Sequence, residues 1–249
     1  MKIAISQPAY LPWLGYFDLI DQVDTFVLLD SVQFEKQSWQ QRNRIKTPSG
    51  LQWLTVPVVF RGHFGQRIRD VAIRDPEFFR KHLKAIELNY RRTPFFHRYF
   101  PEFSEILQSH STSLLVELNQ QLIQWLCNVL GIRTELFRSS DLDERGHRSE
   151  LLVNLCLRLR SDFYLSPLGS AVYLLEDIDQ FADAGIEVGF QHYEHPEYSQ
   201  LFLPFQSHAS VLDLIFNKGS ESISILRSGR RPAFRPGEVV CEMGSGDNQ

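Results

Sequence analysis

The sequence predicts an α/β fold, with a mainly parallel sheet flanked by helices and a helical region in the middle of the chain. Short apolar runs alternate along the chain with segments whose apolar residues recur at helical spacing. The first run, Lys2–Ile5, is followed by a helical pattern over Phe17–Val23 and a second apolar run over Thr25–Asp30. This order is typical of a βαβ unit with two buried parallel strands.

The polar segment that follows, residues 30–46, is rich in amides and cations and has no clean periodicity. A turn at Pro48–Gly50 leads into an expected strand over Gln52–Val58. These two pieces form either a hairpin or an ordered loop that returns to the sheet. We then expect a mobile loop at Arg61–Gln66 and a short strand at Val71–Ile73.

Helices dominate a subregion of about residues 75–131. Asp75-Pro76 begins a helix that runs to Tyr90, Thr93-Pro94 begins one that runs to Leu107, and a third spans Ser113–Leu130 before Gly131. The remaining expected elements are strands at Thr134–Phe137, Asp162–Ser166 and Ile186–Phe190, helices at Glu150–Leu159, Ala171–Ala184 and Ser210–Phe216, and a flexible polar loop at Asp141–Ser149.

Composition limits the organisation and the partners of the chain. We expect one α/β domain over residues 1–228, followed by a flexible extension rich in Arg, Pro and Gly over residues 229–249. The net charge of −4 gives no electrostatic basis for binding nucleic acid or an anionic membrane. Without a basic leader or an apolar run of membrane-spanning length, we expect a cytoplasmic protein with no membrane span; the oligomeric state is left open.

The three cysteines are widely spaced and match no zinc or redox motif. Cys127 and Cys156 lie in apolar helical patterns, so we expect them to be buried in the core. His192 and His195 are three residues apart ahead of a proline, with no third ligand nearby, and we expect no metal site.

The first strand-to-helix loop is the leading candidate site. It holds two prolines, three aromatic residues and a glycine, far more than an ordinary connection needs. Ligands bind outside the carboxyl ends of strands in parallel sheets. We therefore expect Gln7, Tyr10, Trp13 and Tyr16 to bind substrate, the alternative being a rigid hydrophobic plug at the end of the sheet.

Two further segments could complete this site. The cations and amides after the second strand suit a phosphate or carboxylate group, or else form a solvated basic face; the candidates are Gln33, Lys36, Arg42, Asn43 and Arg44. The turn between Ser166 and Ser170 is either a phosphate cradle or an ordinary capped turn. His82 is a candidate general base and Asp30 a candidate acid, and the neighbouring Lys81 is a candidate for binding substrate. The alternative for His82, the more frequent one for such a histidine, is a helix residue bonded to solvent.

These motifs together resemble the WbqC-like protein family. The resemblance rests on the segments Gln7–Phe17, Asp30–Gln33, Arg42–Lys46, Trp53–Pro57, Lys81-His82 and Ser210–Gly219, and covers roughly residues 1–226. Gln41 departs from the family pattern, which usually has asparagine there, but keeps an amide. The resemblance implies a role in O-antigen and related polysaccharide biosynthesis, as a glycine (aminoacyl) or other acyl transferase acting on an amino sugar.

Under this hypothesis the protein forms an amide on a nucleotide-linked amino sugar. Arg42, Asn43 and Arg44, with Gln33, hold the phosphates of the nucleotide sugar or of ATP, which is a candidate cofactor. The aromatic residues of the first loop pack on a ring, and His82 takes a proton from the attacking amine. The competing hypothesis is a module that binds a nucleotide sugar or phosphate without chemistry of its own.

Overall fold

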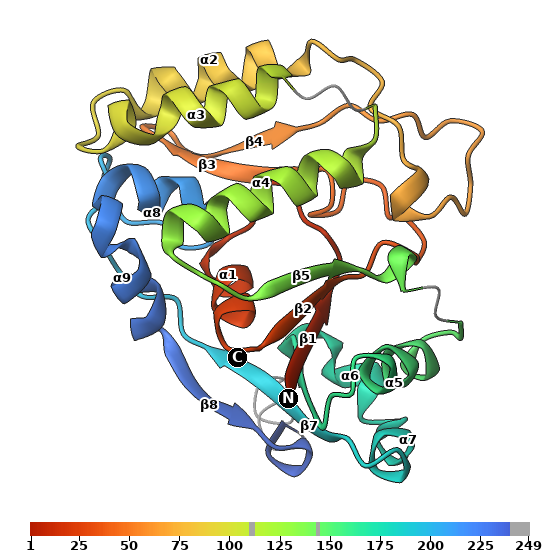
Figure 1. Ribbon diagram of the computed structural model, residues 1–249. Coiled ribbons are helices and arrows are strands. Elements are labelled where there is room, and N and C mark those ends of the chain that lie inside the picture. Colours follow the sequence, from red (N-terminus) through yellow and green to blue (C-terminus); the bar gives the residue numbers. More distant parts are fainter. Residues whose placement is uncertain (110–112, 143–144, 240–249) are drawn as a thin grey trace.

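The computed structural model describes residues 1–109, 113–142 and 145–239 (Figure 1). Its main sheet has six strands in the order β5-β2-β1-β6-β7-β8. All neighbouring pairs are parallel except β7 and β8, so the predicted α/β fold is confirmed. The strands are β1 (Lys2–Ser6), β2 (Thr25–Leu28), β5 (Glu135–Arg138), β6 (Phe163–Ser166), β7 (Glu187–Tyr193) and β8 (Arg230–Phe234).

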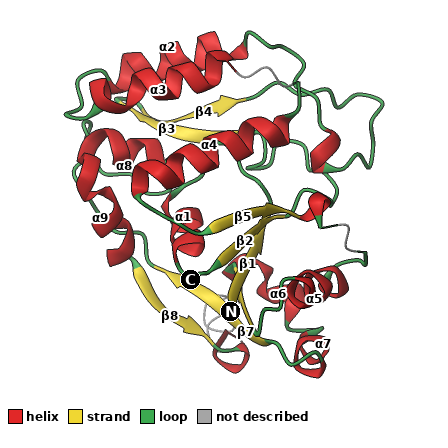
Figure 2. Cartoon of the chain, in the orientation of Figure 1, coloured by secondary structure: helices red, strands yellow, loops and turns green. Residues whose placement is uncertain are grey.

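The alternation of side chains along β1 divides the core between the two faces of this sheet. Ile3 and Ile5 belong to one apolar cluster and Ala4 to another, because successive side chains of a strand point to opposite faces. The first cluster contains buried side chains of α5 (Ser149–Arg158), α6 (Ala171–Leu174) and α7 (Ile178–Asp183). The second contains buried side chains of α1 (Leu14–Asp21), α4 (Leu115–Leu130) and α8 (Val211–Lys218). Helices thus cover both faces of the sheet (Figure 2).

The segment after β2 forms a hairpin that stands apart from the main sheet. Strands β3 (Arg42–Thr47) and β4 (Gly50–Thr55) pair in antiparallel fashion, which confirms the hairpin alternative. In Figure 1 the hairpin lies next to α2 (Phe78–Tyr90) and α3 (Phe96–Ser109), and β3 also contacts α8. The expected helical subregion is therefore confirmed by α2, α3 and α4, and Gly131 ends α4 with a left-handed backbone (φ 75°).

Two expected elements are wrong in detail. Val71–Ile73 do not form a strand: they make only isolated bridges, and Val71 and Ile73 bond to Leu115 and Ser113 at the start of α4. The helix expected over Ala171–Ala184 is split into α6 and α7 at Asp177, whose backbone is not helical. The Asp177 carboxylate accepts hydrogen bonds from Ser149 and Gln180, so it serves the junction between the helices.

The C-terminal segment is more ordered than the sequence suggests. Helix α9 (Ser222–Ser228) was not expected, and β8 occupies the start of the segment assigned to a flexible extension. Strand β8 pairs with β7, and Arg230 binds Asp18 and Asp21 of α1 at 2.8 Å and 2.5 Å, which ties this strand to the first helix as well. Of the earlier expectations, residues 143 and 144 of the polar loop and residues 240–249 of the extension, with Cys241, lie outside the described residues.

Cys127 and Cys156 are buried free thiols, as predicted. Burial raises the pKa of each to about 12, which keeps both thiols neutral. Among the described residues, no helix is long and apolar enough to span a bilayer.

Candidate functional site

A pocket of about 560 Å³ lies at the carboxyl ends of the central parallel strands. Ser6 and Gln7 at the end of β1, residues 167–169 after β6, and Gln191 and Tyr193 of β7 all line it. From β1 the chain passes to β2 on one side, whereas β6 pairs on the other side, so the pocket lies where the strand order reverses. Open α/β sheets bind their ligands at this switch point.

The first loop is held rigidly in place at the pocket. The Tyr10 amide donates to the Trp39 carbonyl at 2.9 Å, and the Asn43 side-chain amide donates to the Leu11 carbonyl at 2.8 Å. The Val211 amide at the start of α8 donates to the Pro12 carbonyl at 2.8 Å. The amide-rich segment and the hairpin therefore brace the loop, and the loop in turn positions Trp13 and the residues around it.

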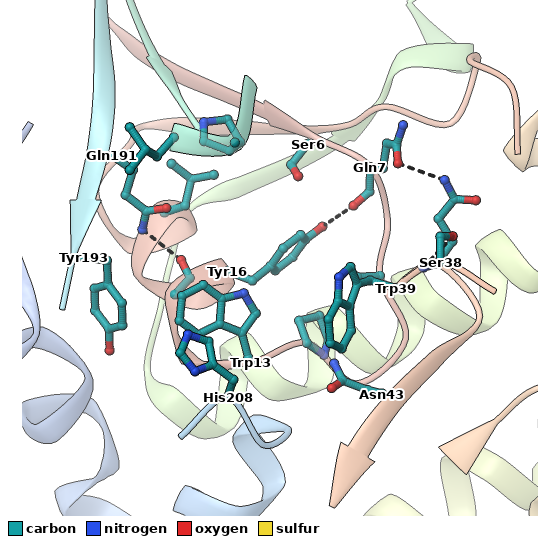
Figure 3. A pocket seen from close by; sticks show the side chains of 18 of the residues that line it. Ser6, Gln7, Trp13, Tyr16, Ser38, Trp39, Asn43, Gln191, Tyr193 and His208 are labelled. Carbon is teal, nitrogen blue, oxygen red and sulfur yellow. Dashed lines mark hydrogen bonds between the residues drawn. The ribbon is translucent and has the colours of Figure 1, made fainter. Parts of the chain in front are cut away.

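Aromatic rings form much of the pocket wall. The Trp13 ring stacks on His208 with 4.8 Å between ring centroids and meets Tyr193 edge-on at 5.7 Å. The Tyr16 hydroxyl donates to the Gln7 carbonyl at 3.1 Å, which orients its ring in the wall. Figure 3 shows Tyr193 beside Trp13 and His208, with the half-exposed Trp39 on the opposite side of Trp13 from Tyr193. Flat rings of this kind suit a base or a sugar.

Side-chain amides fix the polar part of the pocket. Gln40 donates to the Gln7 side-chain carbonyl at 2.8 Å. Gln191 donates at 2.8 Å both to the Gly15 carbonyl and to the buried carboxylate of Asp18 (Figure 3 shows the first of these bonds). These bonds set the direction of the remaining amide atoms before any ligand enters, and a preorganised site loses less entropy on binding.

Arg44 brings a positive charge to the pocket. Its guanidinium lies 5.4 Å from the ring centroids of both Trp39 and Trp53, and its Nη2 is 3.5 Å from the His208 carbonyl oxygen. Its Nε atom is buried and has no hydrogen-bond partner among the described residues. Arg44 also forms no ion pair with a described carboxylate, so its charge is free to bind a phosphate or carboxylate.

His208 contributes an imidazole to the pocket. Partial burial, together with the nearby Arg44 charge, lowers the pKa of His208. The ring is therefore neutral near pH 7 and able to accept a proton. Glu35 also lines this pocket and is exposed, so the site carries an acid as well as a cation.

The two residues expected to act in catalysis lie outside the pocket. His82 is buried, with its Nδ1 2.8 Å from the Tyr10 hydroxyl and a second hydrogen bond to the Thr55 backbone, and burial lowers its pKa to about 4. Asp30 is fully buried, pairs with Arg138 at 2.8 Å and accepts further bonds from two serines, Ser139 and Ser140. Both side chains hold neighbouring segments together within the protein.

The pocket unites five of the predicted site residues: Gln7, Trp13, Tyr16, Asn43 and Arg44. Tyr10 is fully buried behind the loop, and Ser166 is buried and donates to the Pro167 carbonyl. The others do not line the pocket; Gln33, Lys36 and Lys81 are exposed, whereas Arg42 and Ser170 are half-buried.

His208, Gln191, Tyr193, Glu35 and Gln40 line the pocket but were not singled out from the sequence. His208 follows β7 in an irregular segment, where no periodicity shows the direction of a side chain. Tertiary bonds place it: the Ser210 amide donates to the Arg44 carbonyl at 2.8 Å, and Ser210 bridges to Trp13. The nearest signal in the sequence is the segment Ser210–Gly219, which carries part of the family resemblance and begins two residues after His208.

Comparison with known proteins gives two matches over most of the chain. A family model described as the WbqC-like protein family matches residues 7–225. An uncharacterized protein of Mycobacterium tuberculosis is 38% identical over 231 residues, which cover 92% of this chain and 99% of that protein. No solved structure matches.

Proposed function

The chain belongs to the WbqC-like protein family, and from this premise we propose that it is a transferase that forms an amide on a nucleotide-linked amino sugar. One observation carries the proposal: an aromatic pocket at the switch point of the sheet contains Arg44, a cation without a counter-ion among the described residues. The family resemblance supports the amide-forming chemistry and a place in O-antigen or related polysaccharide biosynthesis.

The shape and chemistry of the pocket suit such a substrate. Its volume of about 560 Å³ falls in the range of small-molecule sites. Stacking on an aromatic ring contributes about 0.5–1.5 kcal/mol, and the Arg44 guanidinium can bind two phosphate oxygens at once. The pocket therefore offers separate partners for the ring and for the anionic group of a nucleotide sugar.

The reaction requires an activated acyl donor and a base. The sugar amine attacks the acyl carbonyl, a C–N bond forms, and the leaving group departs with the electron pair of the broken bond. The amine must also lose a proton, and His208 is the neutral imidazole placed to accept it. In this scheme His82 is a positioning residue, because its hydrogen bond supports Tyr10 from behind the loop.

A second candidate function is binding of a nucleotide sugar without chemistry. It is favoured by the fact that His82 and Asp30 are occupied in internal hydrogen bonds. The two functions predict the same affinity for the nucleotide sugar and differ only in turnover.

The test incubates the protein with nucleotide-activated amino sugars, glycine and ATP, and follows amide product and AMP by mass spectrometry. Binding is measured in parallel by calorimetry. We expect Arg44→Ala to weaken nucleotide-sugar binding about tenfold or more, since a charge-assisted contact is lost. His208→Asn should lower turnover about 10²-fold or more and weaken binding far less, through the lost stacking on Trp13.

Lys36→Ala is the matched control for Arg44, because Lys36 is an exposed cation of the same segment that does not line the pocket. Binding without any turnover would reject the transferase and leave the binding protein. No binding of any nucleotide sugar would reject both functions.

A further inference from the structure

We propose that the binding site continues past Arg44 into a second pocket, so that a nucleotide-linked sugar spans both. The nucleoside lies in the aromatic pocket described above, the diphosphate lies against Arg44, and the sugar occupies the second pocket. This inference rests on the proposed function and assigns the two halves of its substrate.

The second pocket has a volume of about 840 Å³ and adjoins the first. Leu51 at the turn of the hairpin lines it on one side, and His195 and Gln206 of the segment between β7 and α8 line it on the other. Arg44 and His208 line both pockets and therefore form the boundary between them.

The boundary is suited to a diphosphate. Arg44 has no ion pair with a described carboxylate, and its Nε atom lacks a hydrogen-bond partner there. Trp39 and Trp53 flank the guanidinium, which limits its orientation. In a nucleotide sugar the diphosphate is the anionic link between two ring systems, so a lone cation between two cavities matches this arrangement of charge.

The two pockets offer different groups to a ligand: indole rings that suit a nucleoside line the first, and polar atoms that have no partner in the described part of the chain and suit a sugar belong to residues of the second. The rings of the first include two indoles, Trp13 and Trp39, whereas those of the second are Phe205 and two imidazoles. In the second, His195 Nε2 and Gln206 Oε1 are buried polar atoms without a hydrogen-bond partner among the described residues. Both atoms are closed off from solvent, so each side chain must turn toward the pocket before a sugar hydroxyl, which both donates and accepts hydrogen bonds, can pair with it.

This orientation also places the reacting group near the base. An amino sugar in the second pocket lies next to His208, which lines that pocket as well. The exposed residues Ser49 and Glu197 at its rim leave this half of the site open to solvent, where an acyl donor can approach the amine.

The test blocks the second pocket with Ser49→Trp. Ser49 is exposed in the hairpin turn, and its structural bond is made by its backbone amide to the Thr47 hydroxyl at 3.2 Å, which the substitution keeps. Gln52→Trp adds the same indole to an exposed position of the same hairpin that lines neither pocket. Gln206→Leu is a second variant that removes the unpartnered amide without adding bulk.

Calorimetry compares UDP with UDP-glucosamine, and dTDP with dTDP-4-amino-4,6-dideoxyglucose. For each pair that binds the unaltered protein, Ser49→Trp should lower the affinity for the sugar conjugate by about tenfold or more. It should lower the affinity for the free nucleotide by less than about twofold. Gln206→Leu should act in the same direction and Gln52→Trp should change neither; melting temperatures confirm that each variant is folded.

Equal effects on conjugate and nucleotide, or no effect on either, would overturn the spanning site while the proposed function stands. If Ser49→Trp lowered the affinity for the free nucleotide more than that for the conjugate, the nucleoside would occupy the second pocket, and the proposed orientation of the substrate would be overturned. If the unaltered protein bound none of the four ligands, the proposed function itself would fail, and this inference with it.

Discussion

Replacing Gly15 with alanine should displace Trp13 from the pocket wall. A Cβ atom at this position would lie 2.3 Å from Trp13 Cη2 and 2.4 Å from Cζ2. Ordinary contacts of a Cβ atom begin near 3.4 Å, so the indole must move by about 1 Å. The indole also stacks on His208 and contacts Tyr193, and both contacts would be disturbed.

The magnitude follows from opposing effects. Alanine in a helix gains about 0.5–1 kcal/mol over glycine. Overpacking costs about 1–3 kcal/mol, and each disturbed aromatic pair about 0.5–1.5 kcal/mol. We expect a net loss of about 1–5 kcal/mol in the free energy of unfolding, which for a chain of this size lowers Tm by about 2–20 °C.

Differential scanning calorimetry measures this change, and tryptophan fluorescence follows the pocket during ligand titration. Gly169→Ala is the matched control, because this pocket-lining glycine has nothing within 4 Å of an added Cβ atom and its backbone is not left-handed. A Gly15→Ala variant with the Tm and ligand affinity of the unaltered protein would refute the reasoning.

Two further predictions concern the buried polar residues outside the pocket. Burial lowers the pKa of His82 from 6.5 to about 4, so the unfolded chain binds a proton that the folded protein excludes. The free energy that neutral His82 contributes to folding should be fully present above about pH 6.5 and should fall by about 3 kcal/mol towards pH 4. Urea unfolding should show that the stability of His82→Gln depends less on pH over this range. The same pH dependence in the variant and the unaltered protein would exclude this role. Asp30→Ala leaves Arg138 and the serine donors without their acceptor and should cost about 3–5 kcal/mol in urea unfolding, whereas a loss below 1 kcal/mol would contradict the buried pair.

The elements that the sequence predicted well are those with strong local periodicity. The first strand, first helix and second strand follow from apolar spacing, and Gly131 marks the end of α4. The position of the pocket follows from the rule that ligands bind outside the carboxyl ends of parallel strands. Applying this rule to the first loop requires only the succession of strands and helices along the chain. Strand order could not be predicted, because the pairing of β1 with β6 depends on contacts between segments far apart in the chain.

The roles of single histidines illustrate what local pattern cannot settle. His82 was expected to be either a general base or a helix residue bonded to solvent, but its side chain is buried between α2 and the first loop, and burial there lowers its pKa. His208 has no periodic neighbours, and its place beside Trp13 and Arg44 is fixed by the hairpin and α8. Sequence reasoning therefore predicted the loop that builds the pocket and missed the ring that completes it.

The position of β1 in the sheet has a consequence for synthesis on the ribosome. The apolar strand β1 (Lys2–Ser6) pairs along one edge with β2, the next strand in the chain. Along its other edge it pairs with β6, about 160 residues later. At a synthesis rate of about 5–20 residues per second, that edge stays unpaired for roughly 10–30 s. An open apolar edge is a site for pairing with other chains, so the nascent protein has most need of a chaperone during this interval, before β6 leaves the ribosome.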